Sequence, residues 1–180
     1  KMYGGFMGTE TEIAQRDITT NTTILSGDLQ GNDVNTTNFV TNYSNVTRNA
    51  DNSYHIIDIT SNGNNLLLDG FTISDAHNNL NNTERGGAIV KEKSIAKLTL
   101  KNCIIKDNVS RNDNAGLVAE FELNNLNSSR GLLSIDKCEF TNNMSRWGTA
   151  IYSFVRSNTN VDIEISNSLF SKNVAENLSS

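Results

Sequence analysis

The sequence predicts an all-β fold, a right-handed single-stranded parallel β-helix with about three strands in each coil of roughly 30–35 residues. A segment that recurs four times, at residues 66–73, 98–105, 133–140 and 163–170, carries this prediction. Its copies end at Ile73, Ile105, Phe140 and Phe170, which are 32, 35 and 30 positions apart. A repeat of this length with a β pattern inside it is typical of a stacked array, in which each coil contacts only its neighbours.

Apolar and polar residues alternate within each copy. In the second copy, Leu98 and Leu100 share one face, and Cys103 and Ile105 return to it after an offset of one residue. Alternation with a period of two indicates β-strands, and the offset indicates a bend between two consecutive strands. The predicted ladder of inward residues contains Leu68, Phe71, Ile73, Leu100, Cys103, Ile105, Ile135, Cys138, Phe140, Ile165 and Phe170.

Turn residues follow the strand pairs. Asn108, Asn143 and Asn173 each lie three positions after the end of one of the last three copies. Asparagine tolerates left-handed backbone geometry and hydrogen-bonds its neighbours, so these residues are expected to form the turns and to stack as a ladder. A Gly-Gly-Ala-Ile phrase at 86–89, with related phrases at 115–118 and 147–151, predicts a third strand. Its corner glycines are Gly86, Gly87, Gly116 and Gly148.

Residues 1–180 are predicted to be a single β-helical segment. Residues 1–53 form the first coil or coils, with short strands at 2–6 and 23–27 and a long polar loop at 30–53, and residues 54–180 hold the regular repeats. Neither end resembles the polar cap that a stacked array needs, so we expect a fragment of a longer protein.

Composition narrows the classes of function. The net charge is −5, with no basic stripe interleaved with aromatic residues, which argues against a nucleic-acid partner. No stretch approaches the roughly 20 apolar residues of a membrane helix, so membrane insertion of this segment is not expected. Hydrophobic residues make up 36% of the chain, a modest share that suits a thin core repeated along an axis.

The two cysteines, Cys103 and Cys138, occupy the same place in consecutive copies. Equivalent residues of adjacent coils are expected about 4.8 Å apart, which lies within the Cα separation of a disulfide. Two small thiols that fill one apolar column are the alternative. The second interpretation is favoured, because in-register neighbours rarely have the side-chain orientation that a disulfide needs.

Several phrases resemble known families. Gly-Gly-Ala-Ile at 86–89 and Phe-x-x-Asn at 140–143 and 170–173 resemble the repeats of polymorphic outer-membrane proteins, which are β-helical bacterial surface proteins. The phrases that resemble secreted β-helix proteins of Bacteroidetes-type bacteria lie at 3–10, 15–17, 23–28, 52–57 and 68–73. The resemblance implies a pectin-lyase-like fold, secretion or display at the outer membrane, and adhesion. It implies no catalytic residues.

The pectin-lyase-like fold also hosts polysaccharide lyases and glycoside hydrolases, so a carbohydrate-active enzyme is an alternative function. Such an enzyme needs carboxylates gathered beside the scissile bond. The outward column here reads Asp69, Lys101, Asp136 and Ser166, which does not concentrate paired carboxylates. If the chain is an enzyme, its candidate catalytic residues are Asp69, Asp136 and Arg146.

No cofactor is expected, and Ca²⁺ is the metal for which candidate ligands exist. Asp28, Asn32 and Asp33 lie in an acidic, Gly-containing turn, and oxygen ligands at short spacing suit Ca²⁺. The alternating order of a Ca²⁺ loop is missing. A turn in which these side chains bond the backbone is therefore the favoured interpretation.

The first functional hypothesis is a non-catalytic scaffold, such as the passenger of an adhesin-like protein, located outside the cell or at the outer membrane. Its expected partners are host or environmental glycans or surface proteins. The polar loops at 30–53 and 78–85 are the predicted contact regions, because loops held by a rigid scaffold commonly carry binding. A purely structural spacer is the third hypothesis.

Overall fold

The computed structural model describes residues 1–33, 51–60, 65–78, 86–92, 96–111, 115–122, 130–146, 148–156 and 160–175. These residues form β-strands and one short 3-10 helix, η1 (Ile13–Gln15). The strands build four sheets, A to D, in which neighbouring strands are parallel. Within the described residues, no helix has the length and apolar content needed to cross a membrane.

Each sheet collects one strand from successive passes of the chain. Sheet A contains β1 (Met2–Tyr3), β4 (Leu66–Asp69), β8 (Leu98–Lys101), β12 (Gly131–Asp136) and β16 (Val161–Ser166). Sheet B contains β2 (Thr23–Ser26), β5 (Phe71–Ser74), β9 (Ile104–Lys106), β13 (Glu139–Thr141) and β17 (Leu169–Ser171). Sheet C contains β3 (Ile57–Ile59), β7 (Ile89–Lys91), β11 (Leu117–Glu122) and β15 (Ile151–Arg156). Sheet D contains β6 (His77–Asn78), β10 (Val109–Ser110), β14 (Met144–Ser145) and β18 (Val174–Ala175).

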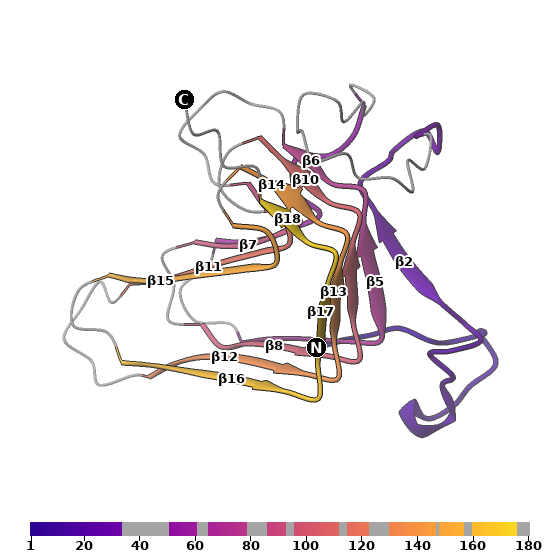
Figure 1. Ribbon diagram of the computed structural model, residues 1–180. Coiled ribbons are helices and arrows are strands. Elements are labelled where there is room, and N and C mark those ends of the chain that lie inside the picture. Colours follow the sequence, from indigo (N-terminus) through magenta and orange to yellow (C-terminus); the bar gives the residue numbers. More distant parts are fainter. Residues whose placement is uncertain are drawn as a thin grey trace.

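From β4 onward, the chain visits the sheets in the order A, B, D, C and then begins again. In Figure 1, sheets A and C lie one above the other, sheet B closes one side, and sheet D lies above sheet C. Each complete pass therefore contributes four strands, and the prediction of about three is wrong. The additional strands are those of sheet D. Two residues are too few to show an alternating pattern, so the sequence does not reveal them.

The recurring segment stacks in register. Ile73 pairs with Ile105, Ile105 with Phe140, and Phe140 with Phe170. The alignment made from the sequence is thereby confirmed, although its steps differ in length. Strands keep their register because one face is buried, while the connections between strands absorb the extra residues.

Two columns of left-handed residues turn the chain between sheets. Between sheets A and B, Asn102, Lys137 and Asn167 have φ values of 49°, 53° and 49°. This column lies at the bend predicted from the offset. The second column, between sheets B and D, contains Asp75, Asp107, Asn142 and Lys172. The left-handed residue thus immediately precedes Asn108, Asn143 and Asn173, so each turn is centred one residue earlier than predicted.

The core lies on the inner faces of sheets A, B and C. Nine residues of the predicted inward ladder are buried: Leu68, Phe71, Ile73, Leu100, Cys103, Ile105, Ile135, Cys138 and Phe140. The other two, Ile165 and Phe170, are 49% and 42% exposed, which corrects the prediction. They lie on β16 and β17, the edge strands of their sheets, so within the described residues only one neighbouring strand covers each of them.

The third strand predicted from the glycine phrases exists as β7, β11 and β15 in sheet C. These strands begin towards the end of each phrase and continue beyond it, because the glycines form the corner that precedes the strand. The predicted polar loop at 30–53 lies outside the described residues between 34 and 50. The predicted contact loop at 78–85 lies outside them from 79 onward.

Candidate functional site

An open groove of about 440 Å³ lies at the corner where sheet A turns into sheet B. We call it the corner groove. Three successive passes form its floor with residues 102–104, 137–139, and 167 with 169, which are equivalent positions of the repeat. Its wall is the segment between η1 and β2, which contributes Ile18, Thr19 and Thr22. The site therefore combines a repeated floor with a wall that occurs once.

The N-terminal segment that forms the wall packs closely against the bend between β4 and β5. Gly70, at the bend between β4 and β5, has a φ of 84°, and a Cβ placed on it would lie 2.6 Å from Ile18 Cγ2. A Cβ on Gly4 would lie 2.3 Å from the Gly70 carbonyl oxygen. Larger residues at these positions would push the N-terminal segment away. The glycines of the Tyr-Gly-Gly-Phe phrase thus serve close approach of two backbones.

Asp69, a candidate catalytic residue, instead anchors this segment. Its side chain is only 7% exposed, and its Oδ2 lies 2.6 Å from Arg16 Nη2. Arg16 Nη1 also donates to the Asp69 carbonyl oxygen at 3.0 Å, and the guanidinium lies over the Tyr3 ring. Asn102 Nδ2 donates to Asp69 Oδ1 at 2.7 Å. Both carboxylate oxygens are engaged in holding the fold.

Asp136, the second candidate, occupies the equivalent place two strands away. Its Oδ1 accepts hydrogen bonds from Asn167 Nδ2 and Ser166 Oγ, both at 2.9 Å. These bonds, that of Asn167 first, lower the pKa of Asp136. A carboxyl with a lowered pKa stays ionised and does not have the raised pKa of a general acid in glycoside hydrolysis.

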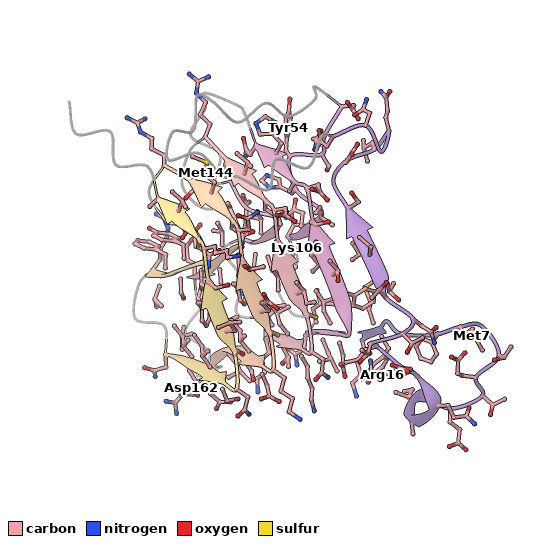
Figure 2. The ribbon with its side chains drawn as sticks, turned by 45° about the vertical axis from the view of Figure 1, so that its right-hand side comes forward. Met7, Arg16, Tyr54, Lys106, Met144 and Asp162 are labelled. Carbon is pink, nitrogen blue, oxygen red and sulfur yellow. The ribbon has the colours of Figure 1, made fainter. Side chains whose placement is uncertain are left out.

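Arg146, the third candidate, is exposed and follows β14 in sheet D. Figure 2 labels Met144 of β14 at the upper edge and Asp162 of β16 at the lower edge of the stack. Asp136 ends β12, the neighbour of β16 in sheet A. Strand β13 of sheet B lies between Asp136 and Arg146 along the chain, so the structure does not bring these two candidates together.

The ladder asparagines form a continuous chain of side-chain hydrogen bonds. Asn108 Nδ2 donates to Asn143 Oδ1, and Asn143 Nδ2 donates to Asn173 Oδ1, both at 2.9 Å. Each Nδ2 also donates to a carbonyl oxygen of the preceding pass. Asn108 and Asn143 are fully buried. Since buried polar groups need partners, the ladder is a structural element between passes rather than a ligand site.

The Ca²⁺ candidates form a self-bonded turn. Asp28 Oδ1 accepts from the Gly31 and Asn32 amides, and its Oδ2 accepts from the Asp33 amide at 2.9 Å. These bonds, led by that from Asp33, lower the pKa of Asp28. Asp33 Oδ2 in turn accepts from Asn52 Nδ2 at 2.7 Å. Asp28 thus bonds the backbone, as the favoured interpretation of the turn expects, whereas Asp33 bonds the Asn52 side chain.

The corner glycines sit where sheet C begins. Gly86 and Gly87 are buried before β7, and Gly148 lies before β15, where its carbonyl oxygen accepts from Ser145 Oγ. Gly116 precedes β11, and a Cβ on it would lie 2.4 Å from the Ala150 carbonyl oxygen of the next pass. Only a glycine allows the passes to approach this closely there.

The groove lining can bind a ligand by two kinds of contact. Ile104 and Leu169 are 37% and 56% exposed and offer apolar surface. The middle pass places Glu139 between them and Lys137 at the bend before it, and the opposite charges of these two side chains balance. The amides of Asn102 and Asn167 and the hydroxyls of the wall add hydrogen-bonding groups. This combination suits a ligand with apolar faces and many hydroxyl groups.

Sequence reasoning missed the wall of this groove. Ile18, Thr19 and Thr22 belong to no repeat, and nothing in their spacing relates them to floor residues that lie 80 or more positions later. The glycines at 4, 5 and 70 were the one available signal, because glycine marks close backbone approach. No family model, curated protein or solved structure matches the chain. The resemblance to bacterial β-helical surface proteins therefore stays a prediction.

Proposed function

We propose that the chain is part of a right-handed parallel β-helix of pectin-lyase-like type, which serves outside the cell or at the outer membrane as a non-catalytic scaffold. We further propose that its corner groove binds a glycan. The repeated order of sheets A, B, D and C with parallel pairing supports the first part. Crossovers between parallel strands are right-handed in nearly all proteins, which supports the handedness.

The observation that carries the binding proposal is the repetition inside the groove. Three passes present equivalent positions at the spacing of parallel strands, about 4.8 Å. Ile104 and Leu169 flank Glu139 in one outward column of sheet B. A chain of sugar units repeats on a similar length scale and can place apolar ring faces on the aliphatic residues. Since Lys137 and Glu139 balance in charge, a neutral glycan fits better than an acidic one.

The proposal is tested by binding to an array of neutral and acidic glycans, followed by titration calorimetry with the best ligand. Ile104→Ser should weaken binding about tenfold, which corresponds to about 1.4 kcal/mol. Ile24→Ser is the matched control. Ile24 belongs to the same outward column and is 57% exposed, but it does not line the groove. Its replacement should leave affinity unchanged.

Three results would contradict this function. Absence of glycan binding would favour a structural spacer. An equal loss of glycan affinity in both serine variants would show that the glycan does not bind in the groove. Release of reducing or unsaturated sugar ends from the bound glycan would show an enzyme and overturn the non-catalytic assignment.

A further inference from the structure

Cys103 and Cys138 face each other beneath the corner groove. They precede Ile104 and Glu139, which are paired in register, and the Glu139 amide donates to the Cys103 carbonyl oxygen at 2.8 Å. Neighbouring parallel strands bring such residues about 4.8 Å apart, within the 4.4–6.8 Å Cα range of disulfides. Both are free thiols and are buried, with 0% and 3% exposure.

The two cysteines have equivalent surroundings. Cys103 Sγ lies 3.2 Å from the Lys101 carbonyl oxygen, and Cys138 Sγ lies 3.4 Å from the carbonyl oxygen of Asp136, the register partner of Lys101. Both side chains belong to the core and line the same groove. Equivalent orientation on adjacent strands answers the objection raised by the sequence, namely that in-register neighbours rarely have the side-chain orientation that a disulfide needs.

The surroundings favour a neutral product. A metal would hold both sulfurs as thiolates, each beside a carbonyl oxygen that repels the charge. The single thiolate that the exchange needs, on Cys103, is stabilised by the Gly70 and Phe71 amides. Among the described residues, no group of three or more metal-binding side chains includes the cysteines. A disulfide is uncharged and fits a site that is buried and bordered by carbonyl groups.

We propose that Cys103 and Cys138 form a reversible disulfide between adjacent passes, with a small-molecule disulfide as the oxidant. Cys103 as thiolate attacks one sulfur of the reagent, and the first reagent thiol leaves. Cys138 then loses its proton to solvent and attacks Cys103 Sγ of the mixed disulfide, and the second reagent thiol leaves. Two protein thiols are oxidised and one reagent disulfide is reduced to two thiols. This inference goes beyond glycan binding and does not depend on it.

The order of attack follows from the proximity of the two thiols. The neighbouring Cys138 thiol lowers the pKa of Cys103 to about 7, and Cys103 in turn raises the pKa of Cys138. The thiolate is the attacking species, so Cys103 is the nucleophile and Cys138 the resolving thiol. Both residues line the corner groove, which gives the side from which a small reagent approaches.

The test treats the reduced, folded chain with hydroxyethyl disulfide, alkylates remaining thiols after unfolding, and maps the peptides by mass spectrometry. We expect loss of both thiols together and a peptide that joins Cys103 to Cys138, reversed by dithiothreitol. Two alkylatable thiols after treatment, a mixed disulfide as the end product, or a cross-link between two chains would each overturn the proposal.

Cysteine variants separate the proposed reaction from any effect of the oxidant elsewhere in the chain. Cys138→Ala should stop at a mixed disulfide on Cys103, because no resolving thiol remains. Oxidation of the wild type should raise the melting temperature by on the order of 10 °C, since the bond closes a loop of about 35 residues. The doubly substituted Cys103→Ala, Cys138→Ala chain should show no such rise. A rise in that variant would mean that the oxidant acts elsewhere.

Discussion

Replacing Lys91 by methionine is expected to stabilise the folded chain at neutral pH. Lys91 ends β7 with its side chain fully buried in the core, and its Nζ lies 3.7 Å from the centre of the Phe121 ring. The ammonium group donates to the Glu120 carbonyl oxygen at 3.2 Å. A charge in this position has lost most of its hydration, which costs free energy even with partners.

The magnitude follows from the pKa. Burial lowers the pKa of Lys91 from 10.5 to about 8, against the opposing charge of Glu120, which corresponds to roughly 3 kcal/mol of destabilisation while the lysine is charged. Methionine fills similar space without charge but loses the hydrogen bond, worth about 1 kcal/mol. Lys91→Met should therefore be about 2 kcal/mol more stable than the wild type at pH 7.

The pH dependence gives a sharper test. Because the folded pKa lies below the unfolded one, the unfolded chain binds more protons between about pH 8 and 10.5, and wild-type stability rises across that window relative to Lys91→Met. Urea unfolding followed by circular dichroism should show the difference between the two chains changing by roughly 3 kcal/mol there, and staying constant below pH 8. Lys101→Met, at an exposed lysine of β8, is the control with no such change. Parallel stability curves for wild type and Lys91→Met would refute the reasoning.

Two further substitutions probe how the passes are held together. Asn143→Ala leaves the buried side-chain and backbone donors of Asn108 without their acceptor and should cost about 3 kcal/mol in urea unfolding. Asn173→Ala removes the acceptor of the same two donors of Asn143, but at the partly exposed end of the ladder, where water can replace it, so it should cost clearly less; equal losses would argue against the ladder. Arg16→Ala breaks the buried pair with Asp69 and should cost about 3–5 kcal/mol. If the Arg16 variant unfolds like the wild type, the N-terminal segment is not anchored by this pair.

The regular part of the fold could be predicted because its signals are local. Alternation across two short strands and the offset between them place Leu98, Leu100, Cys103 and Ile105 on one face, and all four are fully buried. The same pattern recurs in four copies, so a strand that is ambiguous in one copy can be assigned from the other three. Sheet D escaped prediction because its two-residue strands carry too little pattern.

The candidate catalytic residues show why a residue's position in the repeat does not reveal its role. Asp69 and Asp136 share an outward column, as the sequence indicates. Their hydrogen-bond partners decide their roles, and these come from the next pass and, for Asp69, from Arg16 in the N-terminal segment. The position of a carboxylate in a repeat therefore does not reveal whether it is available for chemistry.

The sequence by itself determined the repeating architecture of this protein: all-β content, the alignment of the copies, most of the inward ladder and the stacked asparagines. These features depend on short-range alternation and on equal positions in successive copies, both of which are visible in one dimension. The tertiary structure alone decided the corner groove, the burial of Lys91, the proximity of the two thiols and the roles of the acidic residues. Each of these depends on groups far apart in the chain, such as Arg16 and Asp69, which are 53 positions apart. Packing rather than local pattern brings such groups together.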